Sequence, residues 1–295
     1  MTVDLMDLAR TAALAGGQAI LPFAPRSPAG FAARSPAGFV GRPVPADAKA
    51  DGSPLTAADL AAHHAILDVL AASGLPVLSE ESDPDDVAGL ASWTRFWCVD
   101  PLDGTKEFVA GRPEFTVNVA LVERGFPVLG VVHVPVSGVT YGGSAAGAWK
   151  EAPGETRRAL APPADGAPLP ETVVVVASRS HAGPAVDAIL ARIRADGHAV
   201  ETAALGSSLK FCLVAEGAAD LYPRTGPTNA WDTAAAQAVV EAAGGRVAAW
   251  DGTRLGVDAA RPLNPPVVTW RGAAVGRAWP RWAGLAAEHP DAPGR

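Results

Sequence analysis

The fold is decided by Phe96-Trp-Cys-Val-Asp-Pro-Leu-Asp-Gly-Thr105, where an apolar run ends in two carboxylates. We predict a buried strand over Phe96–Val99, followed directly by a turn. Two acids at the end of a buried strand are costly unless a cation compensates them. The turn can direct both carboxylates and the Leu102 carbonyl at one point. If Gly104 and Thr105 begin a helix, their backbone amides would face an anion. Asp-Pro and Asp-Gly are also common turn residues, so a purely structural role is an alternative.

Two further acidic segments, Ser79-Glu80-Glu81 and Trp231-Asp232-Thr233, also lie beside apolar residues. Each has an ordinary explanation, because Asp232 suits a helix N-cap and the two glutamates suit a solvated surface. Taken with Asp100 and Asp103, however, they predict a metal site whose ligands are all oxygen atoms. Such ligands favour Mg²⁺ over Zn²⁺, and Mg²⁺ held by few carboxylates shares its shell with water and substrate phosphate. The sequence therefore predicts a phosphate-binding magnesium site.

The remaining pattern predicts an α/β protein, with an α+β first half over residues 1–168 and an α/β second half over residues 169–295. In the first half we expect helices over 3–21 and 56–70 and strands over 76–78, 96–99, 115–122 and 128–136. In the second half we expect strands over 173–177, near 200, over 219–222 and over 246–249, and helices over 184–196, 208–216 and 232–243. The Pro-rich stretch 161–170 marks the boundary, and we expect the active site between the halves.

One short motif is repeated, first as Arg26-Ser-Pro-Ala-Gly-Phe31 and then as Arg34-Ser-Pro-Ala-Gly-Phe39. Pro and Gly at this density break helices and strands, so we expect a flexible inserted loop over residues 26–46. A tandem motif that docks a partner is the alternative, and in that case the chain could be a scaffold without catalytic activity. A tolerated loop insertion is simpler, because added loop length costs little stability.

Composition and charge exclude several classes of protein. The 295 residues are 48% hydrophobic, which excludes a disordered chain, and 24 Lys+Arg against 31 Asp+Glu argue against a nucleic-acid binder. The two cysteines, Cys98 and Cys212, both lie in apolar runs and predict buried free thiols in a reducing cytoplasm. We find no signal peptide or membrane span, so we expect a cytoplasmic protein; peripheral association with the inner membrane and the oligomeric state stay open.

The acidic segments resemble the signature of the inositol monophosphatase superfamily, the lithium-sensitive, magnesium-dependent phosphatases. Four further blocks are similar to the CysQ type of 3′(2′),5′-bisphosphate nucleotidase within it: Asp51–Asp59, Ser178–His181, Gly206–Gly217 and Tyr222–Asn229. The resemblance implies a layered αβαβα sugar-phosphatase fold. It also implies hydrolysis of 3′-phosphoadenosine 5′-phosphate (PAP) to AMP and phosphate, which clears a by-product of sulfate assimilation.

The resemblance implies one set of metal ligands: Glu80, Asp100, the Leu102 carbonyl, Asp103 and Asp232. The first three hold one Mg²⁺, the last two hold a second together with the bridging Asp100, and Glu80 also reaches a weaker third ion. The implied catalytic residues are Asp59, Glu80 and Thr105. Of these, Thr105 and Asp59 orient or deprotonate the attacking water, so no covalent nucleophile is required.

A nucleotide bisphosphate carries a second phosphate that the metal ions do not touch, and Lys210 and Arg224 are suitable cations for it. The substrate-binding residues that we expect are Leu102, Asp103, Gly104, Thr105, His181, Ser207, Ser208, Lys210, Arg224 and Asp232. Two of them have ordinary alternatives, since Lys210 suits a solvated helix face and His181 suits a cap or the surface. The nearest rival function is a phosphatase for inositol phosphate or another sugar phosphate that uses the same metal ions.

Overall fold

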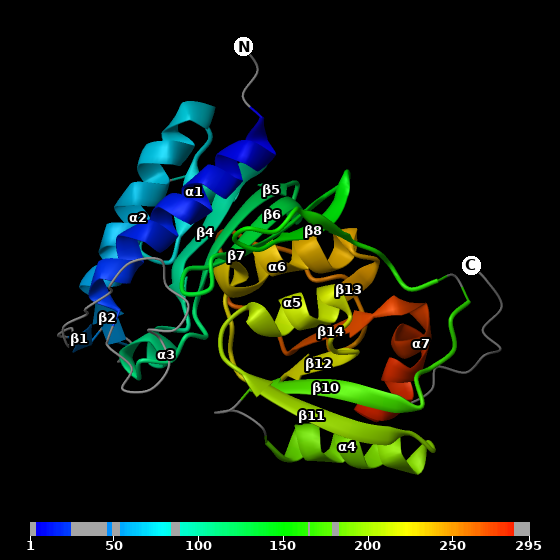
Figure 1. Ribbon diagram of the computed structural model, residues 1–295. Helices are drawn as coiled ribbons and strands as arrows, with labels where there is room; N and C mark the ends of the chain where they lie inside the picture. The colour runs from blue at the N-terminus through cyan, green and yellow to red at the C-terminus, as the bar shows by residue number, and fades with distance from the viewer. Residues whose placement is uncertain are drawn as a thin grey trace.

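Two large β-sheets form the framework of the protein (Figure 1). The computed structural model describes residues 4–24, 46–48, 54–83, 89–164, 166–178 and 183–285. The seven-stranded sheet has the order β3 (Val77–Ser79), β4 (Arg95–Asp103), β5 (Thr116–Glu123), β6 (Phe126–Val134), β7 (Val139–Ser144), β8 (Gly147–Glu151) and β9 (Arg158–Leu160). All its neighbours pair antiparallel except β3 and β4, which are parallel.

The five-stranded sheet lies on the other side of two central helices. Its order is β11 (Ala199–Leu205), β10 (Thr172–Ser178), β12 (Leu221–Arg224), β14 (Val267–Arg271) and β13 (Gly245–Ala249). Strand β10 pairs parallel with β11 and β12, whereas β14 pairs antiparallel with both of its neighbours. A small antiparallel pair, β1 (Ala46–Ala48) and β2 (Pro54–Thr56), lies near the short helix α3 (Thr105–Val109).

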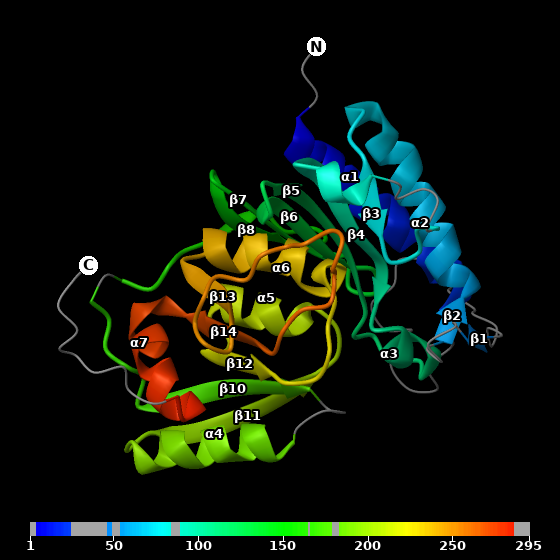
Figure 2. The ribbon, with the colours of Figure 1, turned by 180° about the vertical axis from the view of Figure 1, so that it is seen from behind.

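Helices cover both sheets, so the chain forms five alternating layers of helix and strand. Helices α1 (Leu5–Ile20) and α2 (Ala57–Leu70) cover the outer face of the larger sheet, and α4 (Pro184–Ala195) and α7 (Gly272–Ala283) cover the outer face of the smaller one. Helices α5 (Leu209–Glu216) and α6 (Ala230–Ala242) lie between the sheets, as Figure 2 shows from behind. This arrangement confirms the layered αβαβα fold.

The first helix shows how the sequence builds one of these layers. Asp4 caps it, because its side chain accepts hydrogen bonds from the backbone N–H groups of Met6 and Asp7. Except for Ile20 near its end, its buried stripe consists of small residues: Ala9, Ala12, Ala13, Gly16 and Gly17. Small residues at helical spacing allow α1 and α2 to approach each other closely. A Cβ atom at Gly16 would lie 2.8 Å from Ile66 Cδ1 of α2.

The predicted elements are present in the described residues, with shifted ends and several additions. The strand expected to end at Val99 continues to Asp103, because a register shift opposite β5 leaves Pro101 outside the ladder, where its missing N–H costs nothing. The sequence did not predict β1, β2, β7, β8, β9, β14 or α7. Cys98 and Cys212 are buried free thiols, as expected.

Some expectations are not addressed by these residues. Both copies of the repeated motif lie outside the described residues, as does His181. The expected boundary at residues 168 and 169 falls between β9 and β10, and the division into halves stays a prediction. Among the described residues, no helix has the length and apolarity needed to cross a bilayer.

Candidate active site

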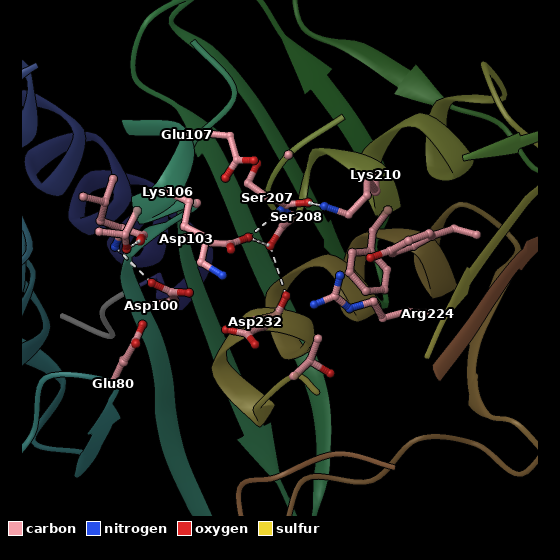
Figure 3. Close-up of a pocket in the computed structure, with 17 residues that line it drawn as sticks. Glu80, Asp100, Asp103, Lys106, Glu107, Ser207, Ser208, Lys210, Arg224 and Asp232 are labelled. Carbon is pink, nitrogen blue, oxygen red and sulfur yellow. Dashed lines mark hydrogen bonds between the residues drawn. The ribbon is translucent and has the colours of Figure 1, made fainter. Parts of the chain in front are cut away.

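A cavity of about 220 Å³ lies where the end of β4, α3, α5 and the start of α6 meet. Among the residues lining it are nearly all the site residues predicted from the sequence: Glu80, Asp100, Leu102, Asp103, Gly104, Thr105, Ser207, Ser208, Lys210, Arg224 and Asp232. Figure 3 shows the acids gathered toward one side of this cavity and Lys210 and Arg224 toward the other. The chain therefore brings distant segments to one place.

The irregular end of β4 places the Asp100 and Asp103 carboxylates. Asp100 pairs with Asn118 of β5 and Asp103 pairs with Thr116, with the register shift between them. Gly104 has φ of 92°, in the left-handed region that favours glycine, and it is the N-cap of α3. A helix does begin at Thr105, which meets the condition under which the Gly104 and Thr105 amides would face an anion.

Three acids converge from the residue after β3, from β4 and from α6. One carboxylate oxygen each of Glu80, Asp100 and Asp232 lies within 4.8 Å of the other two. Asp100 Oδ1 accepts a hydrogen bond of 3.0 Å from the Leu102 N–H, whereas its buried Oδ2 has no hydrogen-bond partner among the described residues. A buried carboxylate oxygen without a donor is expensive, so this atom calls for a cation or a water molecule.

Asp232 is oriented by the first turn of α6. It is not the N-cap residue, because the helix begins at Ala230 and Asn229 takes that position. The Asp232 carboxylate instead accepts a hydrogen bond of 2.8 Å from the Asn229 N–H, which completes a capping box. The local sequence Asn-Ala-Trp-Asp thus fixes the direction of this acid before any ligand binds.

The acids repel one another electrostatically. Burial raises the pKa of Asp100 well above its ordinary range, and the negative charge of Glu80 is the next largest cause. Burial and the charge of Asp103 raise the pKa of Asp232 to about 8, although the Asn229 N–H acts in the opposite direction. Oxygen atoms are the ligands that a hard divalent cation prefers, so these three converging carboxylates suit Mg²⁺.

Asp103 lies in the same cavity but in a different hydrogen-bonding environment. Its Oδ2 accepts hydrogen bonds from both the backbone N–H and the hydroxyl of Ser208, and the hydroxyl bond measures 2.6 Å. Thr116 Oγ1 is a more distant donor to the same oxygen, at 3.4 Å. Its role as a metal ligand stays a prediction, and so does the substrate contact expected for Ser208.

The two residues expected to act on water lie in different positions. Thr105 lines the cavity, and its hydroxyl donates a hydrogen bond of 3.2 Å to the Leu102 carbonyl. Asp59 is buried in the first turn of α2, with 1% of its surface exposed, and is not among the lining residues. Its negative charge raises the pKa of Asp100, so the two carboxylates influence each other electrostatically.

The cationic side of the cavity is formed by Lys210 and Arg224. Lys210 is only 6% exposed, which rules out the alternative of a solvated helix residue. Its Nζ donates to the Ser207 carbonyl at 2.6 Å, and burial lowers its pKa to about 8. Arg224 donates from Nε to the Gly226 carbonyl at 3.2 Å. These bonds hold both cations in fixed positions.

A tightly packed loop, Gly206-Ser207, lies between the acidic and the cationic sides of the cavity. Ser207 has φ of 49°, which is rare for a residue with a side chain. The neighbouring Gly206 donates its N–H to Glu114 Oε2 at 3.1 Å, and a Cβ atom there would lie 2.5 Å from Glu107 Cγ. Only glycine fits at this approach between the loop and α3.

Sequence reasoning missed several residues that the structure brings to the site. Six further residues line the cavity: Lys106, Glu107, Gly206, Phe211, Tyr222 and Thr228. Asn118 lies beneath it and donates to Ser208 Oγ at 2.8 Å. A signal for Asn118 was available, because it is a polar residue in the apolar strand Thr116–Glu123.

An α/β protein of five alternating layers, with an acidic cavity suited to a divalent cation, is the class that the fold and the site define. The model of the inositol monophosphatase family matches residues 28–291. The chain belongs to that family.

Individual relatives agree with this assignment. The chain is 50% identical over 216 residues to the 3′(2′),5′-bisphosphate nucleotidase CysQ of Shigella flexneri, covering 72% of this chain and 83% of that protein. The crystal structure of CysQ from Bacteroides thetaiotaomicron matches with a TM-score of 0.73 and 36% identity, over 91% of this chain and 97% of that one. An inositol monophosphatase from Zymomonas mobilis matches with a TM-score of 0.67 and 25% identity, over 96% and 98% of the two chains.

Proposed function

We propose that this chain is a Mg²⁺-dependent 3′(2′),5′-bisphosphate nucleotidase that hydrolyses PAP to AMP and phosphate. The observation that carries the proposal is that one cavity has a cluster of acids on one side and two fixed cations on the other. A bisphosphate needs both, since one phosphate meets the metal ions and the other needs its own countercharge. The printed names of the Shigella flexneri and Bacteroides thetaiotaomicron relatives support the same substrate class.

The metal ligands follow from the acidic cluster. Glu80, Asp100 and Asp232 would hold Mg²⁺, and Asp103 and the Leu102 carbonyl would complete sites for two ions, with Glu80 also near a third. When bound, such ions lower the pKa of a water molecule and neutralise charge on phosphoryl oxygens. Displacement of one ion by lithium or calcium would inhibit the enzyme.

The chain's own residues orient the water and the substrate. The Thr105 hydroxyl, held against the Leu102 carbonyl, and the buried Asp59 would together orient or deprotonate the attacking water. The amides of Gly104 and Thr105, at the start of α3, would face the phosphate to be cleaved. On the opposite side, Lys210, Arg224 and Ser207 would bind the 5′-phosphate that remains, and His181 would contact the nucleotide.

Cellular context follows from the same proposal. PAP is a by-product of sulfate assimilation, and its hydrolysis would clear it. We infer that the enzyme acts in the cytoplasm, where the buried thiols of Cys98 and Cys212 stay reduced.

The experiment is a phosphate-release panel with added Mg²⁺, comparing PAP, its sulfated precursor, inositol 1-phosphate and fructose 1,6-bisphosphate. We expect the highest kcat/KM with PAP. A higher value with inositol 1-phosphate would favour the rival sugar-phosphate phosphatase, and the absence of release from all four would favour a scaffold. The Asp103→Asn variant serves as the control for contaminating phosphatases, because it should fold and release no phosphate.

A further inference from the structure

A chain of buried hydrogen bonds links β5 to the acidic end of β4 through Ser208, the N-cap residue of α5. Asn118 Nδ2 donates to Ser208 Oγ at 2.8 Å, and Ser208 Oγ lies 2.6 Å from Asp103 Oδ2. The Ser208 backbone N–H donates to that same oxygen. Asn118 and Ser208 are each 1% exposed, so water does not compete for these bonds.

The number of hydrogen atoms on each group decides which atom donates in each of these hydrogen bonds. A hydroxyl has one hydrogen to donate and lone pairs that accept. Asn118 Nδ2 donates to one lone pair of Ser208 Oγ, which leaves the single hydroxyl hydrogen for another acceptor. The Asp232 carbonyl is also within reach, at 3.0 Å, but Asp103 Oδ2 is closer and is a carboxylate oxygen, the stronger acceptor.

We propose that Ser208 and Asn118 are positioning residues that orient the Asp103 carboxylate in the active site. This inference rests on the proposed function, in which Asp103 is a metal ligand. Ser208 uses both of its donors on Oδ2, so Oδ1 is the oxygen left for a cation or the substrate. Asn118 acts through Ser208, because it holds the hydroxyl in the orientation that donates to Asp103.

Strand β5 carries two polar residues opposite the two acids of β4. Thr116 and Asn118 lie two positions apart, and hence on one face of the strand, directly opposite Asp103 and Asp100. Thr116 is 0% exposed and Asn118 is 1% exposed, in a strand whose other buried residues are apolar. Buried polar side chains cost stability unless they are hydrogen-bonded, and the bond that Asn118 donates leads to the acid above it.

The same link joins the two sides of the cavity. Asp103 belongs to the seven-stranded sheet, whereas Ser208 precedes α5, which also carries Lys210. Lys210 Nζ donates to the Ser207 carbonyl, and Ser208 donates to Asp103. The two adjacent serines therefore hold both the Asp103 carboxylate and the Lys210 ammonium group. The arrangement sets the acid relative to the expected phosphate site.

A double-mutant cycle tests the proposal with Ser208→Ala, Asn118→Ala and the double variant, and Ser208→Thr is the conservative variant. The two readouts are kcat and KM for PAP, and the affinity of metal-free protein for Mn²⁺ measured by electron paramagnetic resonance. Mn²⁺ takes the same oxygen ligands as Mg²⁺. Circular dichroism confirms folding, and Asn118→Thr replaces Asn118→Ala if the latter does not fold.

We expect Ser208→Ala to lower kcat by about tenfold to a hundredfold with KM nearly unchanged, and to weaken Mn²⁺ binding in the same direction. Asn118→Ala should have a smaller effect, the double variant should be no worse than Ser208→Ala, and Ser208→Thr should restore most of the activity. A rise in KM with unchanged kcat and Mn²⁺ affinity would overturn the proposal and make Ser208 a substrate contact. Losses that multiply in the double variant would overturn it too.

The two readouts separate this proposal from the proposed function. If the wild-type protein binds Mn²⁺ with coupled losses in the variants but does not hydrolyse PAP, the positioning role stands and the nucleotidase function fails. If the wild-type protein binds no Mn²⁺ and releases no phosphate from PAP, both fail.

Discussion

The carbonyl oxygen of Ala235 lies 2.1 Å from the point that a Cβ atom would occupy at Gly130. Strand β6 therefore touches the backbone of α6 directly. Gly143 of β7 makes a similar approach, since a Cβ atom there would lie 2.5 Å from the Cα of Val239. Helix α6 carries Asp232 in its first turn, so the position of this acid depends on glycines in the sheet beneath it.

We predict that Gly130→Ala displaces α6 and disturbs the acidic cluster. Overpacking of this kind costs roughly 1–3 kcal/mol of the free energy of unfolding, and PAP hydrolysis should fall with it. Urea unfolding and kcat/KM measure the two effects. Gly183→Ala is the matched control, because a Cβ atom there meets open space. Wild-type stability and activity in Gly130→Ala would contradict the prediction.

A second prediction concerns Asp232→Asn. The pKa of Asp232 is raised to about 8 in the folded protein from an ordinary value of 3.8, so the folded state binds a proton that the unfolded state releases. The metal-free protein should therefore lose stability as the pH rises from about 4 to about 8. Asp232→Asn removes this loss, and its thermal midpoint in EDTA at about pH 8 should be higher than that of the wild type, although it releases no phosphate.

Thermal unfolding in EDTA at about pH 5 and about pH 8 measures the difference. The thermal midpoint of Asp232→Asn should exceed that of the wild type only at the higher pH. A variant that is less stable than the wild type at about pH 8 would show that the acids do not repel each other as described. A variant that keeps Mg²⁺-dependent activity would show that Asp232 is not needed to hold the ion.

A third prediction follows from the buried ammonium of Lys210. Burial lowers its pKa to about 8, so the side chain is charged below that pH and loses its proton above it. Since kcat/KM reports groups of the free enzyme, its value for PAP should fall by about tenfold as the pH rises well past 8. Lys210→Arg keeps its charge, so its kcat/KM for PAP should not fall in this way. With adenosine 3′-phosphate as the substrate, the wild-type enzyme should show almost no such fall. An identical fall in Lys210→Arg would assign it to another group.

His133 gives a prediction about stability alone. Burial lowers its pKa from 6.5 to about 4, and its Nδ1 lies 2.9 Å from Thr140 Oγ1. Below pH 6.5 this histidine is protonated in the unfolded chain but stays neutral in the folded protein until the pH nears 4. The free energy of unfolding should therefore decrease as the pH falls from 6.5 toward 4, by up to about 3 kcal/mol. Urea unfolding of His133→Asn should lack this component. Equal pH dependence in the two proteins would refute it.

Elements with clear periodicity could be predicted from the sequence, whereas those built on small residues could not. Strand β7 contains Gly142 and Gly143, which suggest a loop; in the structure they are needed because Trp149 and α6 pack directly against them. Helix α7 contains Gly276 and Pro280, yet Trp279 and Trp282 anchor it in the core. In both cases tertiary packing outweighs local propensity.

The candidate site shows the same division. The acids at strand and helix ends were visible because buried carboxylates are expensive and therefore informative. The contact between Ser208 and Asp103 was not, since these residues lie 105 positions apart and nothing local to either one indicates the other. Burial of Lys210 was hidden as well, because a lysine on a helix usually faces solvent.

The most direct test of the account is the rate of phosphate release from PAP by EDTA-treated protein as Mg²⁺ is added back. If the converging acids hold the ions that make hydrolysis possible, release should be absent at first and rise to saturation with Mg²⁺. A rate that is the same with and without EDTA, or no release at saturating Mg²⁺, would contradict it.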